Sequence, residues 1–110
     1  MHEHSPVAAA SKAAKVVRES PHGRGFAEAV ETYGDALSHI REHDPAHITA
    51  EDIRRLDVEA EQVIEAIERR IESGADGRSV QLELAEAVYG VRRKFEKLVN
   101  WHKHHQGGTT

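Results

Sequence analysis

Large hydrophobic residues recur along this chain at the intervals of helical faces, without the alternation typical of strands. Within residues 26–43 and again within residues 79–105, they stand four and three positions apart in turn. This spacing places the side chains on one side of an α-helix. The first run contains Phe26, Val30, Tyr33, Leu37 and Ile40, and the last contains Leu84, Val88, Val91, Phe95 and Leu98. The pattern predicts an all-α protein.

A third apolar run, over residues 49–72, carries its own start and stop signals. Thr49 and Asp52 have the spacing of a capping box, in which each side chain bonds to the other residue's backbone N–H. The apolar stripe then runs from Ile53 to Ile71, and Gly74 can adopt the left-handed conformation that ends a helix. We therefore expect a helix over residues 50–72.

The N-terminal part of the chain predicts a weaker helix. Ser5 can cap it and Pro6 suits its first position, where a missing N–H costs nothing. The apolar side over residues 6–19 is mostly alanine, with Val7, Val16 and Val17 as its larger members. Because alanine buries little area, we expect this helix to be loosely docked.

Short turns between long helices force neighbours in the chain to lie antiparallel. The expected fold is an up-down antiparallel three- or four-helix bundle with a weakly packed, alanine-rich N-terminal helix. Residues 26–106 should form the bundle core. Residues 1–25 should form the N-terminal helix and a Gly/Pro linker that can be flexible, and residues 107–110 a disordered tail.

The composition narrows the function classes. The chain has no cysteine, which excludes disulfides and thiolate metal sites and fits a reducing, cytoplasmic location. No apolar run is long enough to span a membrane, so we expect no membrane partner. The net charge is −4, and residues 26–72 hold 13 acids against 5 bases. Acidic middle helices should therefore pack beside more basic flanking segments.

Motifs for catalysis and for nucleic-acid binding are weak. The chain lacks His-Glu-x-x-His, phosphate-loop and Gly-x-Ser-x-Gly patterns. Asp57 and Arg70, at the edge of an apolar stripe, are the candidates for buried charge, and edge charges are usually solvated. The basic residues between Arg92 and Lys97 scatter around a helix, and the net negative charge opposes binding to phosphates. The sequence therefore favours a non-enzymatic protein and makes nucleic acid an improbable partner, although it leaves the question of catalysis open.

Nine histidines in 110 residues form the most unusual feature of the composition. In an up-down bundle the second and fourth predicted segments run parallel, so their C-terminal ends meet at one end of the molecule. His39 and His43 lie one helical turn apart, a spacing that lets two imidazoles share a divalent ion. The predicted ligands are His39, His43, His47, His102 and His105, and the ions that suit them are Zn, Ni and Cu. Solvated helix-end charge and a pH-sensitive cluster are the alternatives.

The leading functional hypothesis is a helical interaction or regulatory protein that self-associates or binds a protein partner. Leu82, Tyr89 and Trp101 fall outside the apolar seam of their segment, so at least one should be exposed or lie in a contact with a second chain. The alternative hypothesis is a bundle that binds a divalent metal through its histidine-rich end.

Overall fold

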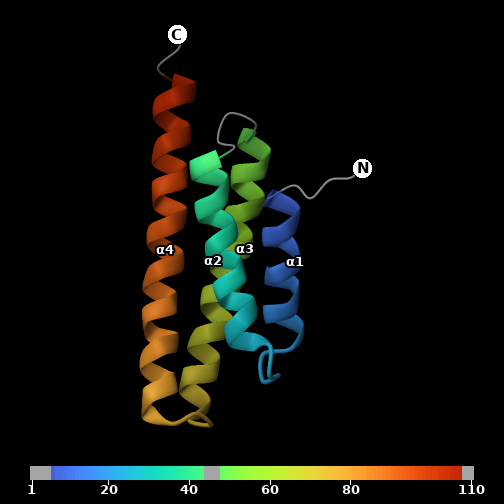
Figure 1. Cartoon of the computed structure of the whole chain (residues 1–110), viewed down its shortest axis with the longest axis vertical. Helices are drawn as coiled ribbons and strands as arrows, with labels where there is room; N and C mark the ends of the chain where they lie inside the picture. Colours follow the sequence, from blue (N-terminus) through green and yellow to red (C-terminus); the bar gives the residue numbers. More distant parts are fainter. Residues whose placement is uncertain (1–5, 44–47, 108–110) are drawn as a thin grey trace.

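The chain folds into helices joined by short turns (Figure 1). The computed structural model describes residues 6–43 and 48–107, and these contain α1 (Pro6–Glu19), α2 (Phe26–His43), α3 (Ala50–Ser73) and α4 (Arg78–Gly107). No strand occurs in that part of the chain, which confirms the all-α prediction. None of the helices described there is both long enough and apolar enough to cross a membrane.

The helices lie side by side along the long axis, and successive helices run in opposite directions (Figure 1). α1 packs against α2 and α3, and α4 packs against the same two helices. α1 and α4 therefore occupy opposite corners of the bundle. α2 and α4 are neighbours that run in the same direction (Figure 1).

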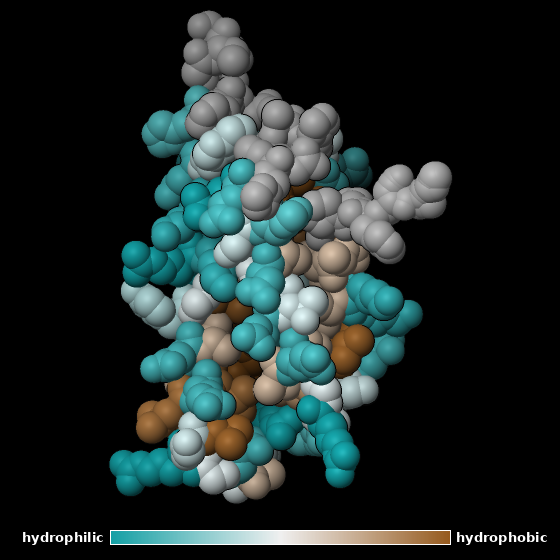
Figure 2. Space-filling view, in the orientation of Figure 1, coloured by the Kyte–Doolittle hydropathy of each residue, from teal (hydrophilic) through white to brown (hydrophobic). Residues whose placement is uncertain are grey.

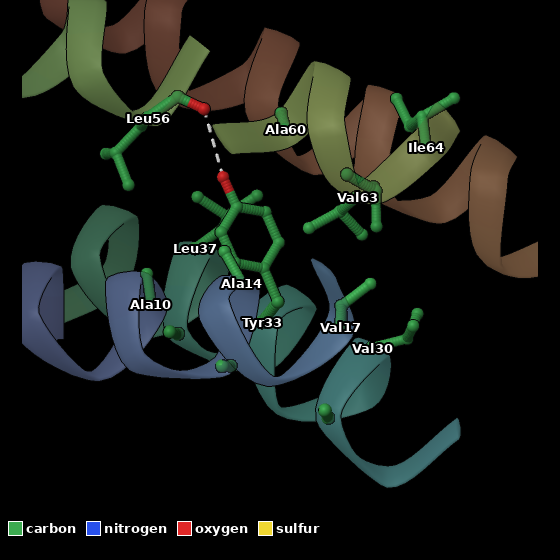
Figure 3. Packing of buried hydrophobic residues seen from close by; sticks show 14 of the residues in the cluster. Ala10, Ala14, Val17, Val30, Tyr33, Leu37, Leu56, Ala60, Val63 and Ile64 are labelled. Carbon is green, nitrogen blue, oxygen red and sulfur yellow. Dashed lines mark hydrogen bonds between the residues drawn. The ribbon is translucent and has the colours of Figure 1, made fainter. Parts of the chain in front are cut away.

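The core follows the predicted seams of the helices (Figure 3). The largest side chains with almost no exposure are Tyr33, Phe26, Leu37, Ile40, Leu56, Ile67 and Leu98. Tyr33 donates its hydroxyl hydrogen to the backbone carbonyl of Leu56 across the core, at an O···O distance of 3.0 Å. This bond supplies a partner for a polar group that burial would otherwise leave unsatisfied.

α1 lies along the bundle with its alanine face turned inward. Ala10, Ala14 and Val17 have no exposed surface and belong to the same hydrophobic cluster as the other helices. The guanidinium of Arg18 donates to the side-chain carbonyl of Gln62 on α3, at 2.7 Å. Small side chains let helices approach closely but remove little apolar area. How firmly α1 is held therefore stays a prediction.

Local signals in the sequence set the ends of α3. The Thr49 hydroxyl accepts from the Asp52 backbone N–H, and the Asp52 carboxylate accepts from the Thr49 N–H, which confirms the predicted capping box. Gly74 takes the left-handed conformation, with φ of 71°, and ends the helix as expected.

The seam of α4 is only partly buried. Leu84, Val91 and Leu98, each seven residues apart, lie in the core. Val88 and Phe95 pack against the core from its edge and remain half-exposed. A position four residues along a helix is rotated by about 40° from the first, and on α4 this rotation brings Val88 and Phe95 to the edge of the contact, whereas the same spacing on α2 is buried throughout.

Candidate functional site

The histidine-rich end of the molecule holds the five predicted metal ligands, and the structure describes the side chains of two of them. His39 is exposed on α2, and His102 is half-buried on α4. His43 and His105 fall within these helices, but their side chains lie outside the described residues, as does His47 altogether. Among the side chains that are described, no group of three metal-binding residues occurs. The metal site stays a prediction.

One of these rings has an unusual environment. The Nε2 atom of His102 is buried and has no hydrogen-bond partner among the described residues. Nearby on the same helix, His104 Nδ1 lies 2.9 Å from the carbonyl oxygen of Asn100, within hydrogen-bond distance. A buried imidazole nitrogen without a partner can accept a proton, a hydrogen bond or a metal ion.

Buried negative charge lies at Glu59, a residue that was not among the predicted sites. Glu59 is 8% exposed, and its Oε2 accepts from the Ser11 hydroxyl at 2.7 Å, linking α3 to α1. Its Oε1 is buried without a partner among the described residues. Asp57, which we had considered for this role, is exposed. The sequence spacing could have predicted this burial, because position 59 is three residues after Leu56 and four before Val63, on the buried stripe of α3.

The carboxylate also acts on its neighbour. Burial, followed by the negative charges of Glu59 and Asp57, raises the pKa of Tyr33 well above its ordinary value. Tyr33 is therefore a neutral hydrogen-bond donor at physiological pH. A phenol held in this state, with its hydrogen given to a backbone carbonyl, has a structural role and offers no catalytic base.

Arg70 joins the α1–α2 and α3–α4 turns, at the end of the bundle opposite the histidine-rich end. Its Nε and a terminal nitrogen donate to the two carboxylate oxygens of Asp76, at 2.8 and 3.0 Å. The other terminal nitrogen donates to the carbonyl of Pro21 at 3.2 Å, and the guanidinium lies 5.0 Å from the centre of the Phe26 ring. This edge charge is thus engaged by the protein itself, and our expectation that it would be solvated was wrong.

The face of α4 that points away from the bundle carries large apolar groups. Leu82 and Tyr89 are 62% and 65% exposed, so the prediction that one of them lies at the surface is confirmed. They stand seven residues apart on one side of the helix, and Leu82 is about 200° around the helix from the buried Leu84. The guanidinium of Arg93 donates to the Tyr89 hydroxyl at 3.3 Å. We call Leu82, Ala85, Tyr89 and Arg93 the outer face of α4.

A groove runs between α2 and α4, on a side of α4 that differs from its outer face. Its volume is about 520 Å³, and its floor includes Val30, Leu84, Ala87 and Val91. In Figure 2, apolar atoms gather over the lower part of α4 beside α2, with polar side chains around them. The rim carries the acids Glu31, Asp35, Glu83 and Glu86, and one basic residue, Lys94. We call this feature the α2–α4 groove.

Two glycines lower the walls of the α2–α4 groove. Gly34 lies on α2 and Gly90 on α4, both inside their helices, where glycine is about 1 kcal/mol less favourable than alanine. A Cβ atom at position 34 would lie 3.2 Å from Nζ of Lys94, whereas one at position 90 would meet nothing within 4 Å. Neither glycine falls on an apolar seam of the sequence, although an isolated glycine inside a helix often has a packing or functional reason.

Comparisons with known proteins give no relative from which a function could be transferred. No protein-family model matches the chain, and searches of curated proteins and of solved structures also find no match. The function must therefore be argued from the surfaces described above.

Proposed function

We propose that the chain is a non-enzymatic helical interaction protein that acts through self-association, with the outer face of α4 as the contact surface. The observation that carries the proposal is the exposure of Leu82 and Tyr89 on one side of a helix that packs against the bundle only with its other sides. Large apolar groups in one exposed stripe usually mark contact surfaces. The second copy of the chain is the occupant that the charges favour.

The charges along α4 divide the helix into two halves of opposite sign. Residues 78–90 hold two acids and one base, whereas residues 91–104 hold five bases and one acid. If two copies pair through antiparallel α4 helices, each acidic half lies beside a basic half. A two-fold symmetric contact of this kind is the commonest form of homo-oligomer.

The register of this pairing can be specified. Glu86 and Arg93 are seven residues apart and therefore lie on the same side of the outer face. With the two-fold axis near Tyr89, Glu86 of each copy faces Arg93 of the second copy. Each exposed Glu86–Arg93 ion pair contributes about 0.2–1 kcal/mol to dimer stability, so burial of Leu82 and Tyr89 supplies most of the free energy of association.

Sedimentation at tens of micromolar tests the proposal. The unchanged chain should sediment as a dimer, the Leu82→Ser/Tyr89→Ser variant as a monomer, and the control Val58→Ser, an exposed valine on α3, as the dimer. Arg93→Glu should weaken the dimer, and adding Glu86→Arg should restore it by exchanging the two charges. A chain that is monomeric throughout, or a dimer that ignores the α4 variants, would contradict the proposal.

Divalent-metal binding at the histidine-rich end is the second candidate function. One observation favours it, namely the buried Nε2 of His102 without a partner among the described residues, on a helix that runs parallel to the helix of His39 and His43. Loss of divalent-ion binding when His43 and His102 are changed together would support it.

A further inference from the structure

The α2–α4 groove supports an inference that does not depend on self-association. We infer that this groove binds an amphipathic helix with basic side chains, supplied by a partner protein. Four features of the groove lead to this assignment: the apolar floor, the charge of the rim, the length of the groove and the glycines in its walls.

The floor and rim together specify the chemistry of the occupant. Val30 and Leu84 close the bottom of the α2–α4 groove but are almost fully buried, so the apolar surface open to a ligand comes from Val80, which is 39% exposed, and from the half-buried Ala87. The four rim acids are exposed, two on each helix. Among the residues that the structure describes, none of these carboxylates forms an ion pair within 4 Å. A helix with one apolar stripe flanked by Lys or Arg on both sides would satisfy the floor and both rims at once.

The length of the α2–α4 groove matches a helical ligand. Its lining on α4 extends from Val80 to Lys94, which spans about 21 Å at the helical rise of 1.5 Å per residue. A ligand helix of about 14 residues has the same length. Such a segment places an apolar residue on the floor at each turn, which is the usual way that a groove between two helices recognises a third.

The glycines indicate that the open space in the α2–α4 groove is kept at a cost. A methyl group at Gly90 would meet no atom within 4 Å, so steric conflict inside this chain does not require glycine there. An alanine at this position would favour the helix but would narrow the groove. The glycine is best explained by a ligand whose backbone or side chain approaches α4 closely at this point.

The rim charge also argues against other occupants. Anionic lipid surfaces and nucleic-acid phosphates attract basic residues, and both would be repelled by four unpaired carboxylates. A protein helix is the remaining class with a regular apolar stripe and a positive flank. The outer face of α4 points to another side, so the proposed second copy engages at most one rim acid, Glu86, and leaves the floor and the other three rim acids of the α2–α4 groove open.

Binding of designed peptides tests the inference. The probe is a 14-residue peptide with Leu at helical spacing and Lys elsewhere, carrying a fluorophore, and the matched control replaces every Lys with Glu. Fluorescence anisotropy should show saturable binding of the Lys peptide at one site per chain, weakening with added salt, and no binding of the Glu peptide. Equal binding of both peptides, or of neither, would overturn the inference.

Variants of the protein locate the site. Gly90→Leu fills the groove, and Glu31→Lys/Glu83→Lys reverses charge on both rims; each should weaken binding by about tenfold or more. Glu72→Lys, which reverses an exposed acid at the end of α3, should change it less than twofold. Circular dichroism must show unchanged helicity for these variants. If Gly90→Leu unfolds, the smaller substitution Gly90→Ala replaces it. Gly90→Ala should raise the unfolding temperature and still weaken peptide binding.

Two further outcomes separate this inference from the proposed function. If Gly90→Leu or Glu31→Lys/Glu83→Lys dissociates a dimer of the protein in the absence of peptide, the second copy occupies the α2–α4 groove and the inference is wrong. If the Leu82→Ser/Tyr89→Ser variant is monomeric and still binds the Lys peptide, the groove acts independently of self-association, as we expect. Failure of the dimer experiment therefore leaves the peptide experiment intact.

Discussion

At the scale of single residues, three polar side chains have hydrogen-bond partners in distant segments of the chain. Tyr33 and Arg70 both have fixed hydrogen-bond partners, and both reach across the bundle to segments far away in the sequence. Glu59 also reaches across, from α3 to Ser11 of α1. These contacts join α2 to α3, α3 to α1, and α3 to the turn between α1 and α2.

The pairing of Arg70 with Asp76 predicts how stability depends on pH. The hydrogen bond from Arg70 holds the pKa of Asp76 below its usual range. A carboxyl group with a lowered folded-state pKa stabilises the fold above its unfolded pKa of about 3.9, and this contribution is lost as the pH falls through the lower, folded value. Asp76→Asn removes the contribution at every pH.

Urea unfolding at a series of pH values checks this prediction. The wild-type chain should be more stable than Asp76→Asn near neutral pH, and the gap should shrink as the pH falls below about 4. Glu72→Gln, which changes an exposed carboxylate near the same turn, should alter the acid dependence less. A constant gap at all pH values would mean that the ion pair does not shift the pKa of Asp76.

At the scale of helices, the contribution of α1 to the stability of the bundle can be tested directly. Its alanine face is buried between α2 and α3, although alanine contributes little area per residue. Buried area is not the only measure of how closely α1 packs. Where small residues pack closely, a larger side chain has no space.

Ala14→Leu should therefore destabilise the chain by about 1–3 kcal/mol, the usual effect of overpacking a core. The matched variant Ala9→Leu, at an exposed position of the same helix, should stay within about 0.5 kcal/mol of the original. Chemical unfolding followed by circular dichroism gives both values. If the two variants behave alike, α1 is held as weakly as its composition suggests, and the fold is carried by α2, α3 and α4.

At the scale of the whole molecule, the parallel course of α2 and α4 brings together features from distant parts of the sequence. It builds the α2–α4 groove from residues about 50 positions apart, and it directs the C-terminal ends of both helices to one end of the bundle. The proposals about partner binding and about metal binding both depend on this one pairing.

The same pairing predicts how a metal would bind. Titration calorimetry with Zn, Ni and Cu should show binding that disappears on acidification, because histidine must be neutral to act as a ligand. Changing His43 and His102 together to Ala should abolish it, whereas changing His22, in the turn between α1 and α2, should not. Affinity no tighter than that of the double variant would reject metal binding and leave the interaction function alone.

Local residue patterns were enough to predict the helices of this protein. Heptad spacing set the helices and most of their buried faces, and Thr49 and Gly74 set the ends of α3. These features could be predicted because they depend on residues within a few positions of each other, where helical geometry fixes which side chains share a face. The exposed stripe of Leu82 and Tyr89 followed from the same local rule.

Which helix faces meet could be seen only from the packing of the folded chain. The buried position of Glu59, the contacts of Arg70 and the α2–α4 groove each depend on groups far apart in the chain, and local spacing does not encode such distances. The glycines illustrate the limit, since Gly34 and Gly90 look like two unrelated weak points until the packing of α2 against α4 places them along one groove. Residue patterns specify faces, whereas the packing of whole helices against one another specifies the sites between them.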